Sequence, residues 1–272
     1  MTKLSSKLLS QYIWQRQTYA DLAQKYDRSK KWVQMKLDEN KVEPVVKLSP
    51  KGLVVVADTT FFSHTNGLVV FREPNLKKNV WWSLVEYERA ESYLRGKSHL
   101  EQNGFNITAV VLDGRPGIRV VFSGLPVQMC QFHQKQIIKR YLTAKPKLEA
   151  SQELKVIVAK LSSIDEQKFA AELKCWHEKW NNFLKQKTAN QNTGRWCYTH
   201  KRLRSAYRSL NTNLPYLFTY QKFPELHIPN TTNSLDGFFN RLKSLVYVHR
   251  GLNAQRRKKI IIEILKGRKF PN

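Results

Sequence analysis

The sequence has few cysteines and no long hydrophobic run. Its three cysteines, Cys130, Cys175 and Cys197, are too few and too scattered for a disulfide framework, so we expect no disulfides and a reducing compartment. No segment approaches the roughly 18 uninterrupted apolar residues of a membrane span, and the N-terminal Met-Thr-Lys-Leu-Ser-Ser lacks an apolar signal core. These absences exclude a disulfide-rich secreted scaffold and an integral membrane protein, and they predict a soluble intracellular protein.

Acidic residues are also scarce. The 272 residues include 21 Asp and Glu against 47 Lys and Arg, which gives a formal net charge of +26. Basic residues run throughout the chain instead of gathering in one tail, and this distribution indicates a broad polyanion-binding surface. With 41% hydrophobic residues the chain can build a real core. A ribosomal or chromatin-type packing protein is the rival interpretation of the composition.

The first forty residues have the apolar spacing of three short helices. Asp27 and Arg28 form the expected turn after the second helix, and Ser29 is placed to cap the third. The pattern predicts a helix-turn-helix in which the third helix contacts DNA. The side chains that this helix leaves for DNA are Lys30, Lys31, Gln34 and Lys36. A plain three-helix packing unit is the alternative, and residues 41–51 are the expected linker to the next domain.

After the linker the pattern changes from helix to strand. We predict strands at 53–57, 67–71 and 80–84, a helix over 86–104, a strand at 107–112, a short helix at 116–122, a strand at 126–130 and a helix at 133–143. The order strand, strand, strand, helix, strand is that of a ribonuclease H-like core, a mixed α/β sheet flanked by helices. Residues 147–220 have helical periodicity without a convincing strand, which predicts an all-α insertion.

These elements predict four segments. They are a helix-turn-helix DNA-binding domain at 1–45, the first part of the core at 50–145, the helical insertion at 146–224, and a last core helix with a basic C-terminal helix at 225–272.

Two of the predicted buried strands end in an aspartate. Asp58 follows an apolar run that starts at Leu53, and Asp113 ends a second run and is followed by glycine. In a ribonuclease H-like sheet the first and fourth strands are neighbours, so the two carboxylates are expected to meet at one edge and to repel each other unless a cation lies between them. A turn or capping role is the ordinary explanation of each aspartate alone.

Four sequence features together resemble the DDE-type transposases of bacterial insertion sequences in the Mutator-like superfamily. They are Asp58, Asp113-Gly, Cys130-Gln-Phe-His133 and Asn230-Thr-Thr-Asn-Ser-Leu-Asp-Gly-Phe-Phe-Asn-Arg-Leu-Lys243. The resemblance runs over about residues 50 to 255. It implies a ribonuclease H-like core with a helical insertion, and a bacterial cytoplasmic protein that works at the nucleoid, as a homo-oligomer on DNA.

The resemblance also implies a catalytic triad. Its members are Asp58, Asp113 and Asp236, which would hold Mg²⁺, replaceable by Mn²⁺, and act on double-stranded DNA at terminal inverted repeats and at the target. The family's third acid is commonly glutamate, and Asp236 is one methylene shorter. Glu225 is the fallback for this third position.

Several further residues are predicted to contact DNA. His133 of the Cys-x-x-His motif is expected at the active-site edge, and a zinc site built with Cys175 and His177, or with Cys197 and His200, is the less favoured reading of that motif. Arg195 and Trp196 combine a guanidinium and a flat ring that can grip phosphate and stack on a displaced base, although a buried tryptophan is the commoner case. Arg241 and Lys243 belong to the same predicted set.

The functional prediction is a transposase that hydrolyses phosphodiesters at transposon ends and joins the freed 3′ hydroxyl to target DNA. A catalytically silent regulator derived from such an enzyme is the first alternative, because Asp236 replaces the usual glutamate. A structure-specific nuclease or junction resolvase on the same core is the second.

Overall fold

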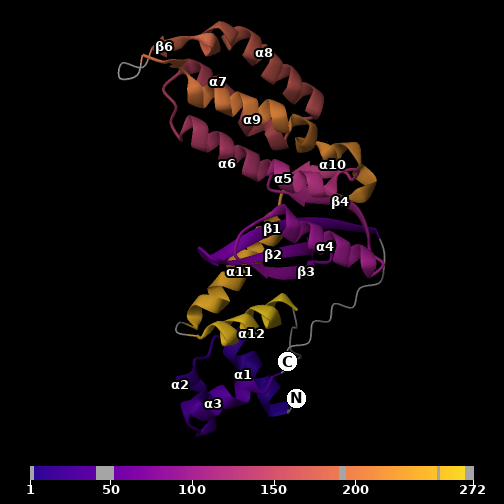
Figure 1. The fold of residues 1–272 in the computed structure, drawn as a ribbon, viewed down its shortest axis with the longest axis vertical. Helices are drawn as coiled ribbons and strands as arrows, with labels where there is room; N and C mark the ends of the chain where they lie inside the picture. The colour runs from indigo at the N-terminus through magenta and orange to yellow at the C-terminus, as the bar shows by residue number, and fades with distance from the viewer. Residues whose placement is uncertain (1–2, 41–51, 190–193, 250–251, 267–272) are drawn as a thin grey trace. The chain divides into compact units, whose positions relative to one another are not determined.

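The structure is a computed structural model that describes residues 3–40, 52–189, 194–249 and 252–266 (Figure 1). The expected linker at 41–51 lies outside these residues. The strands are β1 (Gly52–Ser63), β2 (Asn66–Glu73), β3 (Lys78–Val85), β4 (Asn106–Leu112), β5 (Val127–Met129), β6 (Lys187–Ala189) and β7 (Trp196–Tyr198). The helices are α1 (Lys3–Trp14), α2 (Tyr19–Tyr26), α3 (Lys30–Asp38), α4 (Ala90–Gln102), α5 (Pro116–Arg119), α6 (Gln131–Leu142), α7 (Glu149–Ala159), α8 (Glu166–Lys185), α9 (Lys201–Leu217), α10 (Thr219–Lys222), α11 (Asn233–Val248) and α12 (Ala254–Leu265). None of the described helices is long and apolar enough to span a membrane.

Five strands form one mixed sheet in the order β3-β2-β1-β4-β5. Strand β4 runs parallel to both β1 and β5, whereas β2 and β3 are antiparallel. The apolar runs 53–57 of β1 and 109–112 of β4 are buried, as expected for parallel strands covered on both faces. The first strand was expected to end at Ala57, but β1 continues past Asp58 to Ser63. Helix α4 packs against β4, and α9 and α10 pack against β5. The predicted ribonuclease H-like class, a mixed sheet flanked by helices, is confirmed.

The contacts divide the chain into two units. The first takes in the described parts of 1–50, 59–87 and 233–272, and the second those of 51–58 and 88–232. Strand β1 passes from the second unit into the first after Asp58. The four segments predicted from the sequence stay predictions.

In the first unit the three predicted N-terminal helices are present. Thr18 caps α2 in a reciprocal capping box with Asp21, and Ser29 caps α3 by accepting a hydrogen bond from the backbone of Trp32. Asp27 makes the turn between them in a left-handed conformation, with φ of 49°. The buried faces of these helices carry the residues that the helical spacing marked as apolar, such as Leu22 and Val33.

Helices α1 and α3 are also joined to the C-terminal helices within the first unit. Asp38 at the end of α3 accepts hydrogen bonds from Nε and Nη2 of Arg256 on α12, at 3.2 and 2.8 Å. Tyr12 of α1 stacks on His249, with ring centroids 3.8 Å apart. The unit is thus closed by contacts between residues more than 200 positions apart in the sequence.

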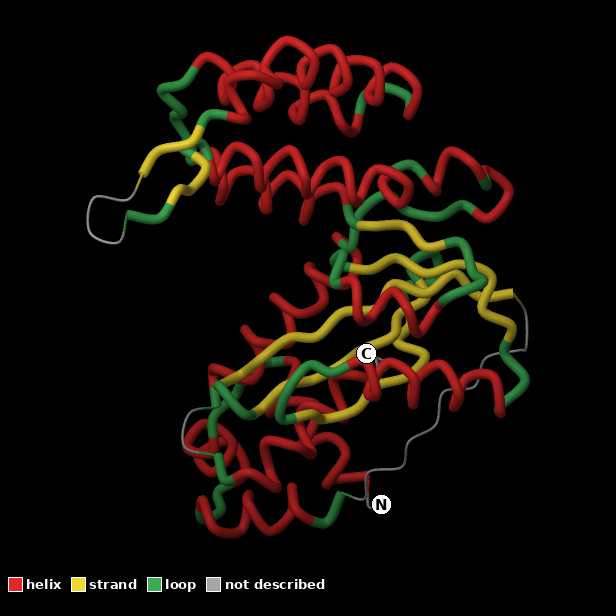
Figure 2. The backbone as a smooth tube through the Cα atoms, turned by 45° about the horizontal axis from the view of Figure 1, so that its top comes forward, coloured by secondary structure: helices red, strands yellow, loops and turns green. Residues whose placement is uncertain are grey.

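The insertion of the second unit is built mainly of helices, as predicted (Figure 2). Its core contains Leu154, Phe169, Trp176, Leu210 and Phe218, and the Trp176 indole donates to the Ala150 carbonyl oxygen at 2.9 Å. One expectation was wrong, because β6 and β7 form an antiparallel hairpin in a region where no strand was predicted. Strands of three residues are too short to show an alternating apolar pattern.

Two helix starts also differ from the sequence prediction. The helix expected from Glu86 begins at Ala90, with Arg89 in extended conformation before it. The helix expected from His133 begins at Gln131, with Cys130 at its N-terminal boundary. The first difference leaves Glu88 in a loop, and the second places His133 in the first turn of α6.

Candidate metal centre

Two aspartates lie side by side where strands β1 and β4 stop pairing. Val56 is the partner of Val111 in the parallel register, so Asp58 and Asp113, each two residues further along, lie at the same level. Asp113 directly follows the last residue of β4, whereas β1 continues to Ser63, so Asp58 lies within β1 just beyond its last pair with β4. The expected proximity of the first and fourth strands therefore brings these two side chains together.

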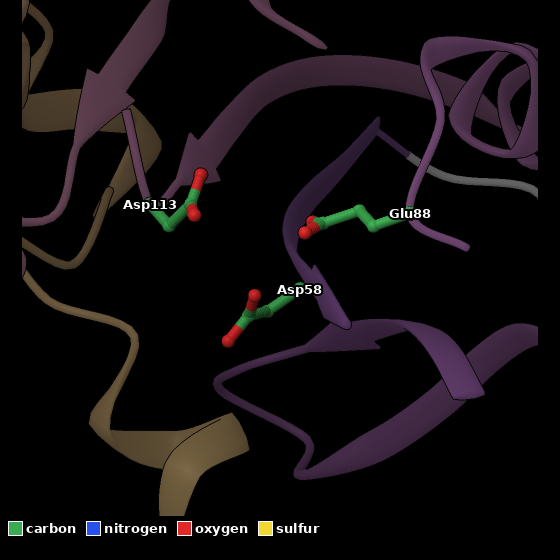
Figure 3. A group of neighbouring side chains, drawn as sticks. All are labelled: Asp58, Glu88 and Asp113. Atoms are coloured by element: carbon green, nitrogen blue, oxygen red, sulfur yellow. The ribbon is translucent and has the colours of Figure 1, made fainter. Parts of the chain in front are cut away.

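Glu88, which the sequence prediction missed, completes a group of three carboxylates. It lies in the loop between β3 and α4, and its side chain extends toward Asp58 and Asp113 (Figure 3). One oxygen from each of the three residues lies within 4.8 Å of the other two. Among the described residues, this is the only group of at least three His, Cys, Asp or Glu side chains that lie closely enough to share a metal ion.

Contacts from two sides hold Glu88 in place. The Tyr93 hydroxyl donates to Oε1 at 2.7 Å, and Nη1 of Arg115 lies 2.8 Å from Oε2. The Glu88 side chain is only 6% exposed. A signal for this residue did exist in the sequence, since Glu86 and Glu88 directly follow a strand in a chain that is poor in acids.

The turn after β4 holds Asp113. The backbone N–H of Arg115 donates to Oδ1 of Asp113 at 3.1 Å, and the Arg119 guanidinium donates to the Gly114 carbonyl at 3.0 Å. Gly114 has φ of +104°, and a Cβ atom there would collide with the Met129 side chain. The positive φ therefore favours glycine at this position, and any larger residue would also force the Met129 side chain to shift.

The electrostatics of the cluster favour a cation. Three carboxylates carry a formal charge of −3, and Arg115 ion-pairs with two of them, Glu88 and Asp113. Hard carboxylate oxygens are the ligands that Mg²⁺, Mn²⁺ and Ca²⁺ prefer. Ligands on opposite sides of Mg²⁺ lie about 4.2 Å apart, so a separation of up to 4.8 Å closes with a small side-chain rotation. The residues present fit a divalent cation.

The two other predicted acids have different surroundings. Asp236 lies in the first turn of α11, in the first unit, and its membership of the site stays a prediction. Glu225 is exposed in a short 3-10 helix at Pro224–Leu226 and is not part of the three-carboxylate group.

The Cys130 and His133 motif forms a hydrogen-bonded cluster with Thr232. The backbone N–H and the hydroxyl of Thr232 each lie 3.3 Å from the Cys130 sulfur, and the hydroxyl lies 3.4 Å from Nδ1 of His133. Burial alone raises the pKa of Cys130, but hydrogen bonds with His133 and Thr232 outweigh it, and the pKa lies below its usual value. This cluster fixes Thr232 to the end of β5.

The residues predicted to contact DNA lie mostly on the surface. On α3, Lys30 and Lys31 are exposed, whereas Gln34 and Lys36 are partly buried. The Lys36 ammonium lies 2.6 Å from Glu39, so an acid of its own helix pairs with it. The first two lysines are therefore the more accessible charges of the predicted recognition helix.

The remaining predicted contacts are spread over both units. Trp196 is 71% exposed on β7, and so is not the buried tryptophan that is commoner in proteins, and Arg195 beside it is exposed. His133 is partly buried on α6. On α11, Arg241 is exposed with its guanidinium 5.4 Å from the Trp14 ring centroid, and Lys243 is partly buried. Their contacts with DNA stay predictions.

The strand order and the paired aspartates define a ribonuclease H-like core with a carboxylate cluster at the edge of its sheet. Among solved structures, the catalytic core domain of BIV integrase is similar to this chain, at 15% identity over 64% of this chain and 95% of that chain, with a TM-score of 0.25. A likeness at this level carries no argument about activity. No family model and no curated protein sequence matches the chain.

Proposed function

We propose that the chain is a DDE-type DNA transposase that cleaves phosphodiesters at transposon ends and transfers the freed strand into target DNA. The observation that carries the proposal is that Asp58 and Asp113 lie side by side where the parallel strands β1 and β4 stop pairing, with Glu88 within reach. The net charge of +26 suits a polyanionic substrate. The Cys130 to His133 motif and the segment 230–243 support assignment to the Mutator-like superfamily by resemblance.

The cofactor of this proposal is Mg²⁺, with Mn²⁺ as a substitute. When bound, such an ion activates the attacking oxygen and stabilises charge on the leaving oxygen. Asp58 and Asp113 would hold it, and the third carboxylate is either Asp236, which the resemblance implies, or Glu88, which the geometry adds. Arg115 places a guanidinium at the edge of the cluster, where it can bind a phosphate oxygen.

The substrate of this proposal is double-stranded DNA, both the terminal inverted repeats and the target. Helices α1 to α3 would recognise the repeats through Lys30 and Lys31, since these side chains are exposed on α3. We expect the protein to act as a homo-oligomer on paired ends, in the cytoplasm of a bacterium and at its nucleoid.

The test is cleavage of DNA that carries the ends of the genetic element encoding the chain. Asp58→Asn and Asp113→Asn should each lower Mg²⁺-dependent and Mn²⁺-dependent cleavage by at least about a thousandfold, because a catalytic ion contributes several kcal/mol of charge stabilisation. Binding of the same DNA should change less than about twofold, because neither residue belongs to the proposed recognition helix.

Asp165→Asn is the matched control. It removes a carboxylate of the same unit that caps α8, and asparagine is an equally good capping residue. Cleavage should be unchanged in this variant. Wild-type rates in either aspartate variant would refute the assignment.

A catalytically silent DNA-binding regulator is the second candidate. The observation that favours it is Arg115, which lies 2.8 Å from Glu88 and 3.6 Å from Asp113 and so supplies part of the positive charge that a metal ion would bring. Such a protein would bind DNA with a steep salt dependence and would cut none of it in Mg²⁺ or Mn²⁺.

A further inference from the structure

A groove opens at one end of the helical insertion. It has a volume of about 820 Å³ and is lined by the last turn of α6, the connection to α7, the β6–β7 hairpin and the first turn of α9. These segments come together at the same end of the helices in Figure 1. We call it the insertion groove, and its lining residues are Tyr141–Thr143, Lys145–Leu148, Ser151, Thr188 and Cys197–Leu203.

The insertion groove is basic and has no acid in its lining. Lys145, Lys147, Lys201 and Arg202 all line it and are exposed, and none of them forms an ion pair with a described acidic residue. The acid next to the groove in sequence, Glu149, lies 3.8 Å from the Lys179 ammonium on α8. Four uncompensated cations in one concave surface attract a multiply charged anion.

Aromatic rings lie among these cations. Tyr141 is 36% and Tyr198 is 38% exposed. The Arg204 guanidinium lies 3.6 Å from the centroid of the Tyr198 ring, so this ring is already part of a stacked pair. Tyr141, at the end of α6, offers its ring without such a cation–π partner among the described residues. Cations next to flat rings are the composition of surfaces that bind single-stranded nucleic acids, where phosphates pair with the cations and bases stack on the rings.

The size of the insertion groove limits the ligand. Its volume falls within the range of roughly 300 to 1,000 Å³ found for small-molecule sites. A few nucleotides of one strand fit such a space. A duplex does not, because its major groove alone is about 12 Å wide and the whole double helix is wider still. The hydroxyls of Thr188 and Thr199 hydrogen-bond to each other at 2.6 Å, which leaves one O–H free to donate to a phosphate oxygen.

We propose that the insertion groove binds an unpaired DNA strand, with Lys145, Lys147, Lys201 and Arg202 on its phosphates and Tyr141 stacked on a base. The proposal rests on the proposed function only in taking DNA as the polyanion, and it requires neither the metal ion nor cleavage. Binding of the unpaired strand can therefore be measured in EDTA and in the Asp113→Asn variant, where cleavage is not expected. A failure of the groove proposal is thus distinguishable from a failure of the transposase assignment.

The experiment is fluorescence anisotropy of a labelled 15-nucleotide oligo-dT with the full chain. Lys147→Gln combined with Lys201→Gln should weaken binding about tenfold at low salt and should reduce the slope of log K against log salt by roughly 1.4, since each phosphate contact on a single strand contributes about 0.7. Tyr141→Ala should weaken binding at least about fivefold, whereas Tyr141→Phe, which keeps the ring, should match the wild type.

The control removes the same charge elsewhere on the insertion. Lys168→Gln combined with Lys174→Gln changes two lysines of α8 that are 75% and 78% exposed and that pair with Asp165 and Glu178. Binding should fall less than twofold in this variant. Lys145→Gln alone provides the same test if the double groove variant loses its cooperative thermal transition.

Three results would overturn the proposal. The first is an equal loss of oligo-dT affinity in the groove and control variants. The second is a duplex of matched length that binds as tightly as oligo-dT and loses the same affinity in the groove variant. The third is poly-glutamate that displaces the labelled oligo-dT at the same charge concentration as unlabelled oligo-dT does. The last result would assign the groove to acidic protein segments.

Discussion

The carboxylates of the two units differ in their charged neighbours. In the first unit the Asp38 carboxylate accepts three hydrogen bonds from Arg256 and has the Lys259 ammonium at 3.9 Å, so two cations face one acid. In the second unit Asp58, Glu88 and Asp113 lie close together, and a single arginine, Arg115, pairs with both Glu88 and Asp113. Because basic residues outnumber acidic ones 47 to 21, composition alone would supply every acid with a cation.

This difference in surroundings indicates that Asp38 stabilises the fold, whereas the clustered carboxylates serve to bind a cation. A matched pair such as Asp38 and Arg256 makes a small contribution to stability at the surface. A cluster of three neighbouring carboxylates costs stability through mutual repulsion, and clusters of this kind are typical of sites that bind a cation or perform chemistry. The comparison can be tested at four points: the turn that holds Asp113, the carboxylate of Glu88, the pair in the first unit, and the carboxylate of Asp58.

The largest effect is expected at the turn that holds Asp113. Gly114→Ala should lower the free energy of unfolding by about 2–4 kcal/mol, because a positive φ costs a side chain roughly 1–2 kcal/mol and the added Cβ collides with Met129. Gly117→Ala is the control, since nothing lies within 4 Å of its Cβ position and alanine favours the helix by about 1 kcal/mol. Urea unfolding measures both. Equal midpoints for the two variants would show that the turn is not constrained as described.

The next effect concerns Glu88. Glu88→Gln keeps an acceptor for the Tyr93 hydroxyl but removes one negative charge from the cluster, and it should weaken Mn²⁺ binding about 10- to 100-fold in calorimetric titration. Glu86→Gln, an exposed residue of the same loop, should leave the affinity unchanged. If Glu88→Gln left the Mn²⁺ affinity unchanged, Glu88 would not be a metal ligand and would serve only to orient Arg115.

The paired aspartates could be predicted from the sequence because local patterns and one topological rule suffice. The apolar run before Asp113 marks the end of β4, and the run before Asp58 marks the part of β1 that pairs with β4, although β1 itself continues to Ser63. A strand order typical of the fold makes the two aspartates neighbours. No contact between distant side chains is needed for this step. The same is true of the cap Ser29, whose partner Trp32 lies three residues away.

Glu88 and the insertion groove could not be predicted in this way. The segment from Glu86 to Arg89 has good helix formers, so local preference favours a helix there, yet Glu88 is held in a loop by Arg115, which lies 115 − 88 = 27 positions further on. The insertion groove joins Tyr141 with residues near Tyr198, more than fifty positions apart. Periodicity carries no information about such pairs, because they depend on how finished elements pack.

The smallest effect is expected at the matched pair of the first unit. The Arg256 guanidinium that hydrogen-bonds Asp38 holds the pKa of that carboxyl below its usual value, against the opposing effect of partial burial. A depressed pKa in the folded state means that the stabilising contribution is complete above the ordinary pKa, about 3.9, and is lost as the pH falls through the folded value. Asp38→Asn should therefore cost about 0.5–1 kcal/mol at pH 7, discounted for exposure to solvent, and less at pH 3.

Asp58→Asn completes the comparison with Asp38→Asn. In EDTA at pH 7 it should leave the free energy of unfolding unchanged or raise it, because it removes one of three carboxylates that repel each other. With Mn²⁺ present the sign should reverse, since a bound ion stabilises the folded wild type and the variant holds it less tightly. Chemical denaturation with and without Mn²⁺ measures both differences. Equal destabilisation of the two variants in EDTA would mean that the cluster, like Asp38, holds the fold together and is not kept for a cation.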